Sequence, residues 1–281
     1  MGEATNILWA GRPLSDGTIE KGYSWNPWIG CQKVSAGCEN CYAARDNKRY
    51  KWVNEWGKDY RLTSDANWNK PIQWAKQAVK DGVIRRVFCA SLADVFDENV
   101  PKKWQEKLLN LIIYTNEIGG LEWLILTKRP ENIVDFLDDE FESRVKNIRI
   151  GVTCENQQMA DERIPILLNI WHGNNFISVE PMLSAISFEK TAYSIRQIGE
   201  RKIAGFTLSG LMRQIDWIIC GCESGSNTRS CNPEWVRDMR DLCTESNIPF
   251  FLKQLNIKGK LVKEPYLDGR QWMEYPEVRN G

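Results

Sequence analysis

Short apolar segments alternate with longer amphipathic segments along most of this chain, and that alternation restricts the folds open to it. Six apolar segments are rich in β-branched or aromatic residues, as strands buried on both faces are. They lie at 86–90, 123–127, 148–153, 176–179, 217–222 and 249–252. Patterns typical of helices lie at 72–80, 102–117, 131–145, 157–170 and 234–246. Strands that alternate with helices form parallel βα units.

The number of strands indicates a barrel. With the segment around 25–30 as a first strand, the chain has about seven strands, more than a small two-layer sandwich needs. We therefore predict an α/β fold, a partial or complete (β/α) barrel, with a doubly wound open sheet as the alternative. A single domain should cover residues 1–281, with an insertion at 187–214 and an irregular C-terminal extension at 254–281.

Three cysteines, Cys31, Cys38 and Cys41, follow C-x6-C-x2-C spacing in a segment that also contains two glycines. Three thiolates on one loop can hold three irons of a [4Fe-4S] cluster and leave the fourth iron open. In radical S-adenosylmethionine enzymes the amino and carboxylate groups of that molecule bind the open iron. The spacing therefore predicts a [4Fe-4S] cluster and S-adenosyl-L-methionine as cofactors.

Two other interpretations of the cysteines stay open. A structural zinc would need a fourth ligand from a distant cysteine such as Cys89, Cys154 or Cys231, and the three thiols could also be unligated. The single histidine, His172, excludes sites that need several imidazoles from one chain. The nine cysteines form an odd set without a signal-peptide pattern, which favours reduced thiols.

The sequence says less about the cellular compartment and about binding to nucleic acids. No apolar run approaches the ~20 residues of a membrane span, so we expect a cytoplasmic protein with no membrane partner. Thirty-seven basic residues balance thirty-seven acidic ones, so any affinity for DNA or RNA must come from a local patch. Tryptophans are mixed with bases in the first quarter of the chain, a combination that suits unpaired nucleobases. The same segment would also fit a helix whose aromatic side packs on the barrel.

Several segments together resemble the phage Gp37/Gp68 family of radical-SAM-like proteins. They are WNPWIGCQKVSAGCENCYA, SLADVF, LTKRPENI, GVTCENQQMADERIPILL, SVEPML, DWIICGCESG and NPEWVRDMRDLC, between about Ser24 and Lys253. The resemblance implies a radical-SAM barrel with its cluster loop after the first strand. It also implies a 5′-deoxyadenosyl radical, an electron donor such as flavodoxin or ferredoxin, and the host cytoplasm if the protein is phage-encoded.

Polar residues follow nearly every predicted strand, and the carboxyl ends of barrel strands surround a common mouth. By analogy with radical-SAM barrels, Ser91 and Asp94 should face the ammonium of S-adenosylmethionine, and Thr153 and Glu155 its ribose. Tyr42 should lie near the adenine, although core packing would also explain it. Lys128, Glu180 and Glu223 remain for catalysis, Lys128 to neutralise a carboxylate or phosphate and the glutamates to contact substrate or transfer protons.

The predicted function is thus a radical S-adenosylmethionine enzyme whose substrate is a nucleotide in phage DNA or in RNA. One alternative is a nucleic-acid-binding module in which a metal only stabilises the N-terminal loop. An open-sheet hydrolase or transferase is disfavoured because the sequence has no Gly-rich phosphate loop and no nucleophile elbow.

Overall fold

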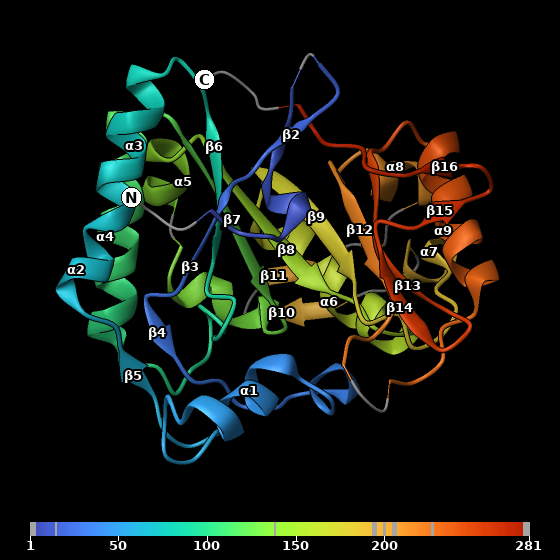
Figure 1. Ribbon diagram of the computed structural model, residues 1–281, viewed down its shortest axis with the longest axis horizontal. Coiled ribbons are helices and arrows are strands. Elements are labelled where there is room, and N and C mark those ends of the chain that lie inside the picture. The colour runs from blue at the N-terminus through green and yellow to red at the C-terminus, as the bar shows by residue number, and fades with distance from the viewer. Residues whose placement is uncertain are drawn as a thin grey trace.

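The computed structural model describes residues 4–14, 16–137, 139–192, 196–198, 201–203, 207–225 and 228–277. Its centre is an eight-stranded sheet in the order β14-β13-β12-β9-β8-β7-β6-β3 (Figure 1). Neighbours from β3 to β13 run parallel, and β14 returns antiparallel to β13. The strands are β3 (Tyr23–Trp25), β6 (Arg85–Cys89), β7 (Leu121–Thr127), β8 (Ile148–Thr153), β9 (Asn174–Val179), β12 (Ile218–Gly221), β13 (Phe250–Ile257) and β14 (Lys260–Lys263).

The sheet curls but does not close, because β3 and β14 are its two edges. Parallel strands need crossover connections, and helices supply most of them. The long helices are α3 (Lys70–Lys80), α4 (Lys102–Ile118), α6 (Gln157–Ile170) and α9 (Pro233–Glu245). Two begin at asparagine caps: Asn156 accepts from Met159 N at 3.0 Å and Asn232 from Glu234 N at 3.0 Å. The result is an open (β/α) half-barrel.

The two faces of the sheet bury different side chains. Residues such as Val87, Trp123 and Ile150 belong to the large core that includes the helices. The alternate residues form a second cluster inside the half-barrel, where Trp9 of η1 (Leu8–Ala10) meets Phe88, Leu124, Phe176, Trp217, Ile219 and Phe251. The period of two along each strand therefore divides the core into an outer and an inner part.

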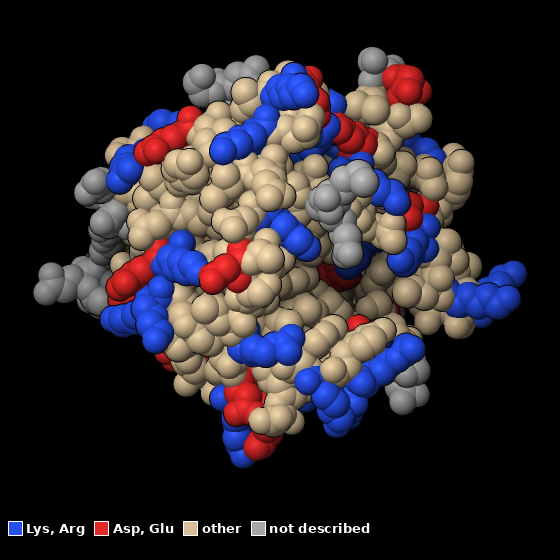
Figure 2. Space-filling model, turned by 60° about the vertical axis from the view of Figure 1, so that its left-hand side comes forward, with Lys and Arg blue, Asp and Glu red and all other residues tan. Residues whose placement is uncertain are grey.

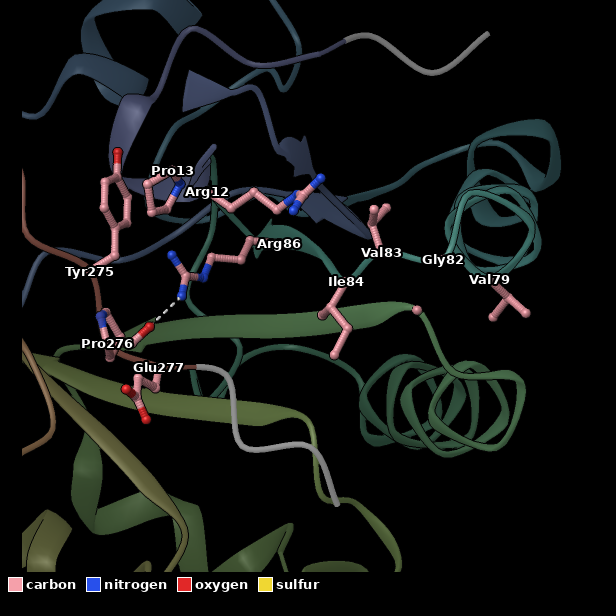
Figure 3. Close-up of a pocket in the computed structure, with 11 residues that line it drawn as sticks. Arg12, Pro13, Val79, Gly82, Val83, Ile84, Arg86, Tyr275, Pro276 and Glu277 are labelled. Carbon is pink, nitrogen blue, oxygen red and sulfur yellow. Dashed lines mark hydrogen bonds between the residues drawn. The ribbon is translucent and has the colours of Figure 1, made fainter. Parts of the chain in front are cut away.

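Paired charges occupy the amino-terminal ends of the strands. Glu122 accepts from Arg86 at 2.6 Å and pairs with Arg149 at 3.2 Å, and all three side chains are buried. Arg86 also donates to Pro276 O at 3.0 Å (Figure 3). A pocket of about 520 Å³ opens beside Arg86 and is lined mainly by apolar groups such as Val83, Ile84, Tyr275 and Pro276. Its arginines are already paired, Arg12 with Glu20 and Arg86 with Glu122.

Smaller elements complete the chain. None of the helices in the described residues has the length and apolar character that a membrane span needs. Near the N-terminus lie β1 (Arg12–Pro13), β2 (Ile19–Glu20), β4 (Trp28–Ile29), η2 (Ala36–Cys38), α1 (Tyr42–Tyr50), β5 (Arg61–Leu62) and α2 (Asp65–Trp68). The later ones are η3 (Pro130–Asp135), α5 (Asp139–Arg144), α7 (Phe188–Ala192), β10 (Arg196–Ile198), β11 (Arg201–Ile203), α8 (Leu208–Met212), β15 (Tyr266–Leu267) and β16 (Arg270–Gln271).

Three expectations can be compared with these elements. The single helix predicted at 131–145 is wrong: η3 and α5 are separate, in a stretch where aspartates favour turns over helix. The proposed insertion at 187–214 contains α7, α8 and the β10–β11 pair, but residues 193–195, 199–200 and 204–206 lie outside the described residues. The extension after residue 254 contains the end of β13, then β14, β15 and β16.

Candidate functional site

A loop that carries all three predicted ligands lies across the carboxyl ends of the strands. We call residues 30–41 the cysteine loop; it joins β4 to α1, which lies below the strands in Figure 1. At its start Gly30 N donates to Leu92 O at 3.1 Å, and Gln32 N donates to Asp97 at 3.2 Å. The loop is therefore fixed to the segment that follows β6.

Two buried glutamates hold the rest of the cysteine loop. Glu155, after β8, accepts from Gly37 N at 3.1 Å, and Glu223, after β12, accepts from the Asn40 side chain at 2.8 Å. Burial by itself would raise the pKa of Glu155, but the Arg163 guanidinium at 2.9 Å holds it below its usual value. Burial likewise opposes the charge of Glu223, and hydrogen bonds from Arg229 lower its pKa. Both carboxylates thus act as ionised acceptors for the loop.

Buried Arg129 and its carboxylate partners lie next to Cys31. Arg129 Nη1 is 4.0 Å from Cys31 Sγ and 3.2 Å from Asp94, and Nη2 donates to Gln32 O at 3.2 Å. Asp94 also accepts from the Thr127 hydroxyl at 2.7 Å and from Lys128 N at 3.0 Å. Burial, and then the nearby Asp94 carboxylate, raise the pKa of Cys31 and favour its neutral thiol. Asp94 therefore orients the end of β7 and the base of the loop through contacts within the chain.

Tyr42 and Ser91 meet at the first turn of α1. The Tyr42 hydroxyl donates to Ser91 O, and the Ser91 hydroxyl contacts Asn26 at 3.0 Å and Ser24 at 3.1 Å. Asn26 Oδ1 in turn accepts from Leu92 N at 2.7 Å. The start of α1 is thus attached to the ends of β3 and β6.

Among the described residues, the Lys128 ammonium has no ion-pair partner and the Thr153 hydroxyl has no hydrogen-bond partner. Lys128 is half-buried at the end of β7, and no described residue forms an ion pair with its ammonium. Thr153 is buried at the end of β8, and its hydroxyl has no hydrogen-bond partner among the described residues. A buried hydroxyl without a partner is costly, and an unpaired ammonium attracts anions. The two groups are suited to a polar, anionic ligand.

Glu180, after β9, lies in a separate part of the mouth. It pairs with Lys253 and accepts from Gln254 at 3.4 Å, both on β13. Gln254 also donates to Cys222 O at 2.7 Å and so connects this pair to the end of β12. The structure therefore brings Tyr42, Ser91, Asp94, Glu155 and Glu223 against the cysteine loop and places Glu180 beside β13.

The cysteine loop fits an iron–sulfur cluster in the kind and place of its donors. All three thiols are free, and soft thiolates are the ligands that such clusters use. In the described residues, however, no three His, Cys, Asp or Glu side chains are grouped as they would be around a metal ion. The three thiols would have to draw together in order to bind one.

Four residues of this site were not predicted from the sequence. They are Asn40, Tyr60, Asp97 and Arg229: Tyr60 donates to Asp97 at 2.7 Å, and Arg229 joins Glu223 to Glu39 and to Ala36 O. Asp97 had one signal, its place three residues after Asp94 in the same loop. Asn40 stands inside the C-x2-C spacing, but Tyr60 and Arg229 lie in segments without a recognisable motif.

The half-barrel confirms the predicted partial (β/α) barrel. The fold is similar to that of spore photoproduct lyase complexed with dinucleoside spore photoproduct, with a TM-score of 0.50, 11% identity, and 80% of this chain and 74% of that chain covered. A double mutant of the lyase with bound AdoMet and dinucleoside spore photoproduct gives 0.45 at 12% identity. The match covers 80% of this chain but only 62% of that protein's length.

The sequence belongs to the DUF5131 family, described as a protein of unknown function, whose profile matches residues 18–276. No curated protein matches the chain. The resemblance to the phage Gp37/Gp68 family stays a prediction, because the family shown is DUF5131.

Proposed function

We propose that this protein is a radical S-adenosylmethionine enzyme that acts on a nucleotide in DNA or RNA. The observation that carries the proposal is the attachment of the cysteine loop to the carboxyl ends of the half-barrel strands by Asp97, Glu155 and Glu223. Chemistry in parallel barrels takes place at that end.

Cys31, Cys38 and Cys41 would hold a [4Fe-4S] cluster at the mouth. Bound there, the cluster would supply the electron that cleaves a carbon–sulfur bond of S-adenosylmethionine. Lys128 would pair with the carboxylate of that ligand, and the Thr153 hydroxyl would bond to its ribose. Tyr42, fixed by its bond to Ser91, would border the adenine.

The remaining acidic residues divide into two roles in this proposal. Asp94, Glu155 and Glu223 position the loop and the strand ends, since their carboxylates are already bonded within the chain. Glu180 and Lys253 form a pair at the mouth that could exchange a proton with a substrate. The electron that reduces the cluster would come from a donor such as flavodoxin or ferredoxin.

Anaerobic reconstitution with iron and sulfide tests the proposal. We expect about four irons per chain, the content of one four-iron cluster, and formation of 5′-deoxyadenosine when a reductant and S-adenosylmethionine are added. Replacing Cys31, Cys38 or Cys41 by serine should abolish both. Cys231→Ser is the matched control, because Cys231 is also partly exposed and lies outside the loop.

A different metal content would contradict the proposal. Stoichiometric zinc in anaerobically purified protein, with no iron uptake and no 5′-deoxyadenosine, would favour the nucleic-acid-binding module with a structural metal. Equal iron loss in Cys231→Ser would show that the cysteine loop is not the binding site.

A further inference from the structure

The end of α1 carries a stacked pair of aromatic rings, Tyr50 exposed and Trp52 half-buried, that the proposed chemistry does not use. We call residues 48–52 the basic aromatic turn. The rings of Tyr50 and Trp52 stack with centroids 5.2 Å apart and planes inclined by 19°, and the Arg49 guanidinium lies 5.2 Å from the centre of the Tyr50 ring. Tyr50 is 54% exposed. More than half of this residue's surface therefore stays accessible to a ligand.

The turn is held in shape by its own chain. Lys51 ends α1 in the left-handed region at φ 52°, which turns the backbone so that Trp52 returns onto Tyr50. The buried Asn47 side chain closes the turn by accepting from Val53 N at 3.0 Å and donating to Val53 O at 3.1 Å. The ring pair is therefore fixed before any ligand arrives, which lowers the entropy cost of binding.

Three bases surround the rings without acidic partners. Lys48, Arg49 and Lys51 are exposed, and no ion pair between described residues includes them, while the nearest acid, Asp46, pairs with Arg45 at 3.2 Å. Figure 2 shows Lys and Arg side chains, with some Asp and Glu side chains among them, in the lower part of the molecule, where Figure 1 places α1. Bases in a last helical turn also suit the helix dipole, which explains Lys48 and Arg49 but not the ring pair beside them.

The turn is connected to the mouth of the half-barrel by α1. α1 has nine residues and spans about 14 Å at ~1.5 Å per residue, from Tyr42 at the strand ends to Tyr50. Tyr42, Arg45 and Arg49 share one face of this helix because they are three and four residues apart. A flexible polyanion held at the turn could follow that face to the cysteine loop.

We propose that the basic aromatic turn is a docking surface for single-stranded nucleic acid. An unpaired base stacks on Tyr50, and phosphates contact Lys48, Arg49 and Lys51. The inference deepens the proposed function and rests on it for the reaction that follows docking. Binding itself requires neither cluster nor S-adenosylmethionine, so the two proposals can fail separately.

Fluorescence anisotropy with labelled single-stranded DNA and RNA of one sequence, and with the matching duplex, tests the docking surface. Tyr50→Ala should weaken single-strand binding about fivefold or more, since one base loses its stacking partner. The double variant Lys48→Ala/Arg49→Ala should make the slope of log K against log salt shallower by about 1.4, from two contacts of about 0.7 each. Tyr114→Ala, an exposed tyrosine on α4, and Lys76→Ala/Lys80→Ala on α3 are the matched controls.

Circular dichroism and iron content show whether each variant is folded. If the double variant is not folded, the less disruptive Arg49→Gln variant repeats the charge test. No binding by the parent, equal losses in the α3 and α4 controls, or tighter binding of duplex than of single strands would overturn the docking surface. Failure of the proposed function instead appears as missing iron or missing 5′-deoxyadenosine while binding persists.

Discussion

Gly151 lies on the inner face of β8, where a larger residue has no room. A Cβ at this position would lie 2.5 Å from the Phe176 ring, which fills the inside of the half-barrel. We expect Gly151→Ala to lower the free energy of unfolding by about 1–3 kcal/mol, as overpacking of a core does. Urea denaturation measures this change. Gly221→Ala is the control, since a Cβ there first meets the flexible Gln254 side chain at 3.3 Å; equal losses in both would contradict the prediction.

The sequence predicted where the residues of the mouth lie, but not which residues they contact. Asp94, Glu155 and Glu223 follow strands, so the alternating pattern placed them at the correct end of the sheet. Their partners come from far along the chain: Gly37 lies 118 residues from Glu155, and Asn40 lies 183 residues from Glu223. No local pattern records such pairs. The ligand contacts predicted for Asp94 and Glu155 stay predictions, and the structure adds the bonds that both carboxylates form within the protein.

At the scale of an element, the cysteine loop should be sensitive to acid. The pKa values of Glu155 and Glu223 lie below the usual 4.5, so their ionised forms stabilise the fold above about pH 4.5, and that contribution is lost as the pH falls below it. Glu155→Gln should therefore destabilise the protein at neutral pH, and its deficit relative to the parent should shrink below pH 4.5. Urea denaturation at pH values between about 3 and 7 checks this.

A suitable control for the acid experiment is Glu245→Gln. Glu245 is exposed at the end of α9 and forms no ion pair with the described residues, so its replacement should change stability little at any pH. A Glu155→Gln deficit that stayed constant down to pH 3 would show that the lost stability comes from packing and not from the charge of Glu155.

Strands were easier to predict than the segments around the loop. The predicted strand 148–153 has the observed bounds, and helix 157–170 does as well, because buried residues and a capping asparagine mark them locally. The region 25–30 was expected to be one strand, but only β3 joins the main sheet and β4 pairs with β5. α1 was considered only as one interpretation of the Trp and Arg segment, because its buried face is just Ala43 and Asn47.

On the scale of the whole molecule, the charges at the amino-terminal ends of the strands join distant parts of the chain. Glu122 pairs with both Arg86 and Arg149, and all three are at most 2% exposed. We expect Glu122→Gln to cost about 3–5 kcal/mol in urea denaturation, because buried Arg86 loses its counter-charge and buried Arg149 keeps only its pair with Asp216. Glu117→Gln, in an exposed pair with Arg144, should cost less than about 1 kcal/mol. Similar losses of unfolding free energy in the two variants would show that the buried cluster stabilises the fold no more than an exposed ion pair does.

The order in which the chain is made has a consequence for the cysteine loop. The loop leaves the ribosome early, but Glu223, which holds Asn40, follows 183 residues later. At ~5–20 residues per second, roughly 10–40 s separate the two during synthesis. The thiols are thus made long before the part of the protein that fixes their loop. A metal bound as proposed above would therefore find its finished site only after Glu223 has been synthesised.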